Sequence, residues 1–218
     1  MPSLDHDFQA CLFDMDGTLI DSEHVWVLAI QHALAGRGVA LPEEEVAHLE
    51  YGRAWQDIFE DITRCWPHAF ASRSEMERET GAFYNEYIRE HDIAIPGSVA
   101  LLKRLHAAGK RVTIVSGSLR ERIAQTLDML GIVDLVPFYT GCGDYEHGKP
   151  APDCFLMSAA ALGVPPEACV VFEDATAGVQ AAKAAGMRCV ALQLPNAPFP
   201  QDLSQADLVL PDLSLFSI

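Results

Sequence analysis

Short apolar runs alternate with helix-like segments along most of the chain, and this alternation limits the possible folds more than any other feature. The first run ends at Phe13, and several of the helical segments after it end at a glycine. Strands separated by helices of about ten to fifteen residues are typical of a parallel sheet with helices on both faces. The sequence therefore predicts an α/β fold. The later predicted strands are 112–116, 136–140, 169–172, 189–192 and 207–210, and the predicted helices are 98–108, 118–130, 153–162 and 176–185.

One of these helices has a recognisable start signal. Ser118 and Glu121 fit the capping-box pattern, in which a serine and a glutamate three residues later bond to each other's backbone N–H groups. We therefore expect Ser118 to cap the helix 118–130.

A second block of the chain is helical and has no strand of its own. Its first part has apolar residues at helical spacing from Val25 to Ala33, and this predicted helix stops at Gly36. Residues 43–92 are rich in Glu, Arg, Trp and Tyr and poor in β-branched runs, and their periodicity predicts helices at about 54–65 and 74–90.

Pro96 and Gly97 close the block, and the regular alternation begins after them. We predict two domains. Residues 1–21 and 93–218 form an α/β core, and residues 22–92 form a helical domain inserted after the first strand.

The composition narrows the class of partner. The 218 residues carry a formal net charge of −16, and 50% of them are hydrophobic. A strongly acidic chain is unsuited to nucleic acid or to an anionic membrane, since both are bound by basic patches. The same charge repels an anionic ligand at long range, so an anion site needs local cations. We expect no nucleic-acid and no membrane partner.

The sequence shows no signal for export. It lacks the roughly 18 consecutive apolar residues of a membrane span. The first residues, Met-Pro-Ser-Leu-Asp-His-Asp, lack the positive start and apolar stretch of a signal peptide. The six cysteines contain no CxxC pair, so we expect reduced thiols and a cytoplasmic protein.

Two carboxylates stand one residue apart directly after the first predicted strand. Asp14 and Asp16 precede Gly17, which allows the chain to turn away at once. In open α/β sheets, ligands bind beyond the carboxyl ends of the strands. Neighbouring acids repel each other unless a cation or a shared proton relieves them, and Mg2+ prefers such oxygen ligands. An Asp-rich turn explains the same residues without a ligand, so the rest of the chain decides between the two.

Other predicted strands also end in polar residues. Ser116 ends the second strand, and Glu173 with Asp174 follows the run 169–172. Because parallel strands share an orientation, these groups are expected at the same edge as the first two acids. Lys149, one of only four lysines, lies nearby in a proline-braced loop. Each residue alone has a plain explanation as an exposed lysine or an acidic helix start, but together they predict one site.

This set of residues resembles the haloacid dehalogenase superfamily of phosphohydrolases. The similarity covers about residues 8–192 and agrees with the family's motifs in order, spacing and strand context. It implies a Rossmann-like three-layer α/β/α core with a mainly parallel sheet. For residues 22–92 it implies the small helical cap of the β-phosphoglucomutase-like branch. The matching motifs are Asp14-Met15-Asp16-Gly17-Thr18, Ser116-Gly117, Lys149 within Gly148–Asp153, and Glu173-Asp174.

The resemblance implies the chemistry of phosphate monoesters. Asp14 would attack the phosphorus and form an aspartyl-phosphate. Asp16 would protonate the leaving oxygen and later take a proton from the hydrolytic water.

The resemblance also implies a set of binding groups. Mg2+ would be held by the carboxylates of Asp14 and Asp174 and by the backbone carbonyl of Asp16, with Glu173 as a further ligand or a neighbour of the ligands. The phosphoryl oxygens would be held by Ser116, Gly117 and Lys149.

The helical domain carries one candidate for substrate recognition. Arg53 stands where caps of this family often present a specificity loop, and arginine suits carboxylate and phosphate groups. We hypothesise that it grips a second anionic group of the substrate. The expected substrate is a small phosphorylated metabolite, a sugar or polyol phosphate, and the expected protein is a monomer.

Other activities compete with a phosphatase. Asp16 argues against a dehalogenase, because a halide leaving group needs no proton. No lysine lies between Asp16 and Lys103, so the Schiff-base chemistry of phosphonatases is unavailable. The family's mutases carry a cap histidine where this chain has Trp26, although His24 is close, so a sugar-phosphate mutase stays open. A non-catalytic phospho-acceptor or binding module also stays open, although it needs neither Asp16 nor a helical insert.

Overall fold

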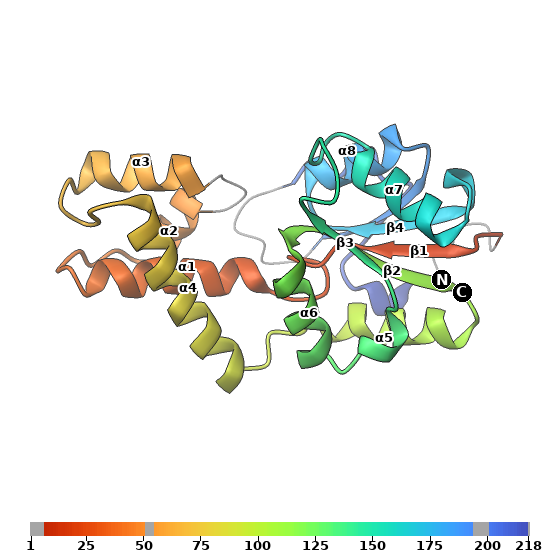
Figure 1. The fold of residues 1–218 in the computed structure, drawn as a ribbon, viewed down its shortest axis with the longest axis horizontal. Helices are drawn as coiled ribbons and strands as arrows, with labels where there is room; N and C mark the ends of the chain where they lie inside the picture. Colours follow the sequence, from red (N-terminus) through yellow and green to blue (C-terminus); the bar gives the residue numbers. More distant parts are fainter. Residues whose placement is uncertain (1–6, 51–54, 194–200, 218) are drawn as a thin grey trace. The chain divides into compact units, whose positions relative to one another are not determined.

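The computed structural model describes residues 7–50, 55–193 and 201–217. The chain forms two compact units (Figure 1). The core unit consists of Met1–Ile20 with Ala94–Ile218, and the helical unit consists of Asp21–Ile93. The sequence prediction placed this insert at 22–92.

The core unit is built on a six-stranded sheet in which every neighbouring pair of strands is parallel, as predicted. The strand order is β3-β2-β1-β4-β5-β6. Every residue of the strand formed by Ala10–Phe13 is buried, because helices cover both faces of the sheet. The strands are β1 (Ala10–Phe13), β2 (Arg111–Leu119), β3 (Tyr139–Cys142), β4 (Cys169–Glu173), β5 (Arg188–Leu192) and β6 (Leu208–Leu210).

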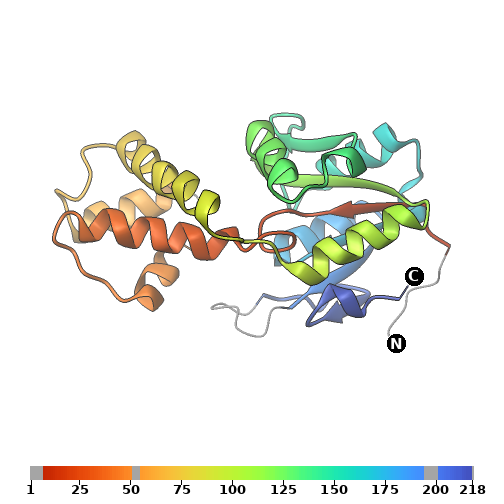
Figure 2. The same cartoon turned by 90° about the horizontal axis from the view of Figure 1, so that it is seen from below.

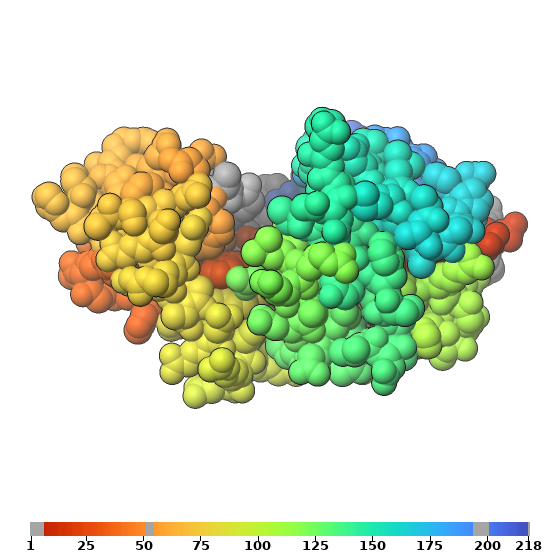
Figure 3. Space-filling view, in the orientation of Figure 1, coloured from red at the N-terminus to blue at the C-terminus, as the bar shows by residue number. Residues whose placement is uncertain are grey.

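Helices cover this sheet in the three-layer arrangement that the sequence predicts. The helices are α5 (Pro96–Ala107), α6 (Arg120–Met129), α7 (Asp153–Leu162) and α8 (Thr176–Ala184), with 3-10 turns at Val133–Leu135, Pro166–Ala168 and Leu213–Leu215. One face of the sheet carries α5 and α6, and the other carries α7 and α8 (Figures 1 and 2). In the space-filling view of Figure 3, the green residues around α6 and the teal and cyan residues that follow them in the sequence form much of the visible surface of the core unit.

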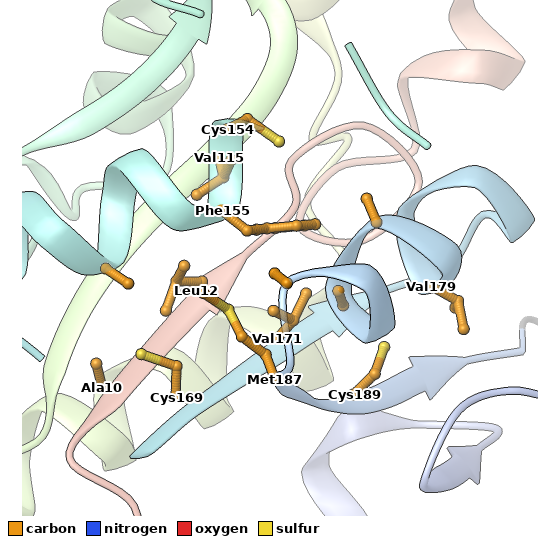
Figure 4. Close-up of a cluster of buried hydrophobic side chains, with 14 of the residues drawn as sticks. Ala10, Leu12, Val115, Cys154, Phe155, Cys169, Val171, Val179, Met187 and Cys189 are labelled. Atoms are coloured by element: carbon orange, nitrogen blue, oxygen red, sulfur yellow. The ribbon is translucent and has the colours of Figure 1, made fainter. Parts of the chain in front are cut away.

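A hydrophobic cluster of the core unit lies between the sheet and the layer of α7 and α8 (Figure 4). Leu12 and Val171, from the neighbouring strands β1 and β4, belong to one fully buried cluster with Phe155 and Val179. Burying a side chain of this size contributes roughly 1.5–3 kcal/mol. The cluster therefore fixes β1 and β4 against the two helices that follow the candidate site residues.

The order of the strands reverses beside β1. β2 pairs with one side of β1 and β4 with the other, so the chain switches direction between β1 and β4. Ligands bind at such switch points in open α/β sheets. The register aligns Phe13 with Phe172, and the Asp14 N–H donates to the Phe172 carbonyl at 2.9 Å. Asp14 and Glu173 therefore emerge side by side at the carboxyl edge.

The described part of the helical unit contains the three helices that its periodicity predicts and a further one at Glu43–Glu50. Trp26 stacks on Tyr84 with ring centroids 4.3 Å apart and meets Trp55 edge-on at 5.2 Å. These contacts join three helices of the unit. Ser72 caps the longest helix by accepting the N–H of Glu75 at 3.2 Å. The helices are α1 (Ser22–Ala35), α2 (Glu43–Glu50), α3 (Trp55–Cys65) and α4 (Arg73–Glu90).

Across residues 7–50, 55–193 and 201–217, every helix falls short of the combined length and apolar character that a bilayer crossing needs.

Two local predictions are wrong. Ser118 does not cap a helix, because β2 continues through it to Leu119 and α6 begins at Arg120 without a side-chain cap. Its hydroxyl instead donates to Asp16. The third strand begins at Tyr139 rather than at residue 136, because Pro137 has no N–H to give to a sheet.

Candidate active site

Polar side chains gather at the carboxyl edge of the sheet, beyond β1, β2 and β4. Asp14 follows β1, Ser116 lies in the last part of β2, and Glu173 ends β4. Asp16 stands in the turn after β1, and Lys149 comes from the loop between β3 and α7. The sequence predicted all five as site residues, and hydrogen bonds link them into two connected groups within the core unit.

Lys149 is the centre of the first group. Its Nζ donates to Asp14 Oδ1 at 2.5 Å, to Glu173 Oε1 at 2.7 Å and to the carbonyl oxygen of Val115 at 3.2 Å. These three bonds use all the donors of an ammonium group. The side chain is 14% exposed, and the Phe155 ring lies 5.1 Å from Nζ. Lys149 is therefore held in place and is not an ordinary surface lysine.

Glu173 is almost completely buried, and both of its carboxylate oxygens accept hydrogen bonds. While Oε1 accepts from Lys149, Oε2 accepts the backbone N–H groups of Asp174 at 2.9 Å and Ala175 at 2.8 Å. A side chain at Gly178 of α8 would collide with this carboxylate, so glycine leaves the room that Glu173 occupies. Glu173 thus connects the lysine to the start of the loop that leads into α8.

Asp174 is tied to the turn that follows β1. The Thr18 hydroxyl donates to its Oδ1 at 2.8 Å. Gly17 has a φ of +82°, and a Cβ at this position would collide with the Asp174 carboxylate. Glycine is required here for both the backbone conformation and the close approach. The motif Asp14–Thr18 therefore positions Asp174 as well as its own two acids.

Asp16 forms the second group with two serines of β2. Its Oδ2 accepts the hydroxyl of Ser116 at 3.1 Å and the hydroxyl of Ser118 at 2.9 Å. Ser118 was predicted only as a helix cap and not as a residue of the site. The sequence did contain a signal for this role. Ser118 lies two residues after Ser116, and alternate residues of a strand share a face.

Burial and charge set the protonation of the first group. Burial raises the pKa of the Asp14 carboxyl well above its usual value, Lys149 opposes this rise, and the neighbouring carboxylates add to it. Burial also disfavours the charged form of Lys149, but the carboxylates of Asp14 and Glu173 outweigh it and hold the pKa of the lysine well above its usual value. The lysine therefore remains charged at neutral pH.

The donor set fits a divalent metal ion. When every carboxyl group of the site is ionised, four negative charges stand against the single positive charge of Lys149. These carboxyl groups belong to Asp14, Asp16, Glu173 and Asp174. Asp14, Glu173 and Asp174 each offer an oxygen within 4.8 Å of the oxygens of the other two. Hard cations such as Mg2+ prefer oxygen ligands of this kind. A divalent ion would relieve most of the excess negative charge.

The other residues considered in the sequence differ in where the structure places them. Gly117 lies in β2 between the two serines. Trp26 is packed against other aromatic rings, and His24 Nδ1 lies 3.3 Å from Glu43 Oε1. Arg53 lies outside the described residues.

Comparison with known proteins gives consistent matches. Residues 8–186 match the family described as haloacid dehalogenase-like hydrolase. Hexitol phosphatase A of Escherichia coli (strain K12) is 34% identical over 95% of this chain and 92% of its own length. Fructose-1-phosphate phosphatase YqaB of the same organism is 33% identical over 86% of this chain and 97% of its own length.

A solved structure shows the same fold with a related sequence. The crystal structure of a HAD family hydrolase from Deinococcus radiodurans R1, with bound phosphate and sodium, has a TM-score of 0.74 and 32% sequence identity. The match covers 94% of this chain and 92% of that chain.

Proposed function

This chain belongs to the haloacid dehalogenase-like hydrolases, and from that membership we propose that it hydrolyses a sugar or polyol phosphate through an aspartyl-phosphate on Asp14. Its relatives are named phosphatases, and the chain is a hydrolase of phosphate monoesters. One observation carries the assignment of the nucleophile. Lys149 Nζ lies 2.5 Å from Asp14 Oδ1, which puts a fixed positive charge beside the carboxylate at the strand switch point.

Asp14 acts as the nucleophile. One of its oxygens bonds to phosphorus while the bond from phosphorus to the ester oxygen breaks, which leaves the phosphoryl group on Asp14. Without a nearby cation, an anionic carboxylate and an anionic phosphate would repel each other. Lys149 reduces this repulsion from a fixed position, which requires no rearrangement during the reaction.

Asp16 moves the protons. It gives a proton to the ester oxygen, so the alcohol leaves neutral. It then accepts a proton from the water that attacks the phosphorus of the aspartyl-phosphate. Inorganic phosphate is released, and the Asp14 carboxylate is restored.

The metal proposal follows from the donor set. Mg2+ would be held by the carboxylates of Asp14 and Asp174 and by the backbone carbonyl of Asp16. When bound, it would supply positive charge to the transferring phosphate. Glu173 already accepts bonds from Lys149 and from two backbone N–H groups, so we assign it to orient these groups rather than to bind the ion.

The phosphoryl oxygens would be held by donors on β2 and by the lysine. We assign this role to the Ser116 hydroxyl, the Gly117 N–H and Lys149. The helical unit is proposed to act as the cap, with Arg53 contacting a second anionic group of the substrate. We further propose that the protein acts as a cytoplasmic monomer.

The relatives narrow the substrate class, and the packing of Trp26 weighs against a mutase. They are named for hexitol phosphates and fructose 1-phosphate, so these esters are the first candidates here. A mutase would need a histidine where this chain has Trp26, whose ring is packed against Trp55 and Tyr84. This packing assigns the position a structural role.

A substrate panel tests the proposal. Phosphate release is measured from sugar, polyol and other small phosphate monoesters with Mg2+, for the wild type, Asp14→Asn and Asp16→Asn. We expect a narrow group of sugar or polyol esters to be hydrolysed, and kcat to fall by about a thousandfold or more in Asp14→Asn. Full activity in Asp14→Asn would reject the nucleophile, and isomerisation without phosphate release would indicate a mutase.

A further inference from the structure

Ser118 and Ser116 both donate to one oxygen of Asp16. The Ser118 hydroxyl lies 2.9 Å from Asp16 Oδ2, and the Ser116 hydroxyl lies 3.1 Å from the same oxygen. The Ser118 backbone N–H also donates to the Ser116 oxygen at 2.9 Å. Ser118 therefore reaches Asp16 directly, and it reaches it a second time through Ser116.

The strand explains why both serines reach the same acid. β2 extends to Leu119, and the hydroxyls of residues 116 and 118 both point to Asp16, although the pairing of β2 with β3 shifts register between Val115 and Leu119. A helix starting at Ser118 would remove this alignment. The extension of β2, which the sequence prediction missed, thus has a chemical consequence at Asp16.

The two bonds determine which oxygen of Asp16 carries a proton. A carboxylate oxygen has two lone pairs, and the two hydroxyls occupy both lone pairs of Oδ2. A proton on Oδ2 would displace one of these donors. Each hydroxyl donated to Oδ2 stabilises negative charge on that oxygen, so even a single donor favours the proton on Oδ1 and orients Oδ1 by holding the other oxygen.

Ser116 has a second task in the proposed function. Its single hydroxyl hydrogen can serve either Asp16 or a phosphoryl oxygen, but not both. Once the phosphate takes that hydrogen, Ser118 is the serine that continues to hold Oδ2. Ser118 carries no other role in the proposed reaction.

We propose that Ser118 is a positioning residue for the general acid Asp16, which sets the carboxyl group so that Oδ1 faces the leaving oxygen. This inference rests on the proposed function. In the step concerned, the oxygen of Asp14 bonds to phosphorus, the bond to the ester oxygen breaks, and the proton on Asp16 Oδ1 passes to that ester oxygen. The products are the aspartyl-phosphate, the neutral alcohol and the Asp16 carboxylate.

The test compares two leaving groups. An alkyl monoester, such as a hexitol phosphate, needs a proton on its leaving oxygen, whereas 4-nitrophenyl phosphate leaves as a stable anion. We measure kcat/KM, which covers only the steps up to formation of the aspartyl-phosphate. Ser118→Ala is expected to lower kcat/KM for the alkyl ester by about tenfold and to leave the aryl ester within about twofold.

The controls separate positioning from folding. Both substrates are assayed on the same preparation, so a misfolded fraction lowers both values equally and cancels in their ratio. Ser118→Thr keeps the hydroxyl and should restore the alkyl-to-aryl ratio toward that of the wild type. Asp16→Asn should shift the ratio in the same direction as Ser118→Ala and further.

Each outcome has a distinct meaning. An unchanged ratio in Ser118→Ala, together with a shifted ratio in Asp16→Asn, overturns the role of Ser118 and leaves the proposed function intact. An unchanged ratio in Asp16→Asn, or an active Asp14→Asn variant, overturns the proposed function and the role of Ser118 with it. If the alkyl-to-aryl ratio shifts in Ser118→Ala and Ser118→Thr does not restore it, the positioning role of Ser118 is overturned and the proposed function stands.

Discussion

Lys149 and Lys183 both form ion pairs with carboxylates, but their surroundings differ. Lys149 is 14% exposed and contacts Asp14 and Glu173, which are themselves buried. Lys183 is 31% exposed and pairs with Asp207, which is 32% exposed. A buried carboxylate that loses its partner is expensive, whereas an exposed pair contributes little. The same substitution should therefore act differently at the two positions.

We predict that Lys149→Met lowers kcat/KM by about a hundredfold or more, because the phosphoryl group and Asp14 lose their fixed cation. The free energy of unfolding should fall by roughly 3–5 kcal/mol, less whatever protonation of Asp14 recovers. Steady-state kinetics and urea unfolding measure the two effects.

Lys183→Met is the matched control for this prediction. It should cost about 0–1 kcal/mol and leave kcat/KM unchanged. Equal effects of the two substitutions on kcat/KM would contradict the assignment of Lys149.

At the scale of single elements, the site restricts which residue a helix can hold at one position. Gly178 and Gly81 both lie within helices, α8 and α4. A Cβ at Gly178 would collide with the Glu173 carboxylate, but at Gly81 it would meet nothing within 4 Å. Helix propensity alone favours alanine at both positions.

We predict opposite outcomes for the two alanine substitutions. Gly81→Ala should stabilise the protein by roughly 0.5–1 kcal/mol, because alanine is the better helix former. Gly178→Ala should destabilise it by roughly 1–3 kcal/mol and lower kcat/KM, because Glu173 must move away from Lys149. Thermal unfolding of both variants decides, and stabilisation by Gly178→Ala would show that Glu173 has room to spare.

The helical unit has an ion pair between the turn that follows its first helix and its last helix. Arg37 Nη1, just beyond the end of α1, lies 2.8 Å from Glu79 Oε2 of α4. This hydrogen bond holds the pKa of Glu79 below its usual value. A carboxyl whose pKa is lowered by folding stabilises the fold above its unfolded pKa, and this stabilisation is lost as the pH falls through the folded pKa.

We predict that Glu79→Gln lowers the free energy of unfolding by about 0.5–1 kcal/mol at neutral pH. The difference from the wild type should shrink as the pH falls below about 4.5, the usual pKa of glutamate, since the wild-type carboxyl then becomes protonated as well. Glu86→Gln, at an exposed position of the same helix, is the control and should show neither effect. A loss of stability in Glu79→Gln that does not change with pH would contradict the electrostatic explanation.

Most elements follow from local sequence, and the exceptions have physical causes. β1 and β4 were predicted because uninterrupted apolar runs have few alternatives in a covered sheet. Ser118 was assigned to a helix cap because Ser-x-x-Glu is a local pattern, whereas its actual partner, Asp16, is 102 residues away. The late start of β3 depends on Pro137, whose missing N–H outweighs the apolar character of the run.

Long-range contacts at the site were predictable only in part. Lys149 and Asp14 are 135 residues apart, and only the motif order and the parallel sheet indicated that they would meet. The contacts of Glu173 were not predictable, because they depend on the exact placement of two backbone N–H groups and on the space left by Gly178.

At the scale of the whole molecule, the charge distribution explains why the site is built as it is. The chain carries a net charge of −16, so its overall field repels a phosphate ester. Local cations must therefore supply the attraction, and Lys149 is the lysine held among the acids of the site. A divalent ion on these acids would add the positive charge that the chain itself lacks. Attraction of the phosphate ester to the site thus depends on a few fixed positive charges at one edge of the sheet.

The central claim is that Asp14 carries the phosphoryl group during turnover. The direct measurement is a rapid acid quench of the wild type, Asp14→Asn and Asp16→Asn with an aryl phosphate and Mg2+, followed by peptide mass spectrometry. We predict a phosphorylated peptide containing Asp14 in the wild type, more of it in Asp16→Asn because the base for the second step is missing, and none in Asp14→Asn. Phosphate release by the wild type with no phosphorylated peptide in either the wild type or Asp16→Asn, or a phosphoryl group on a different residue, would contradict the account.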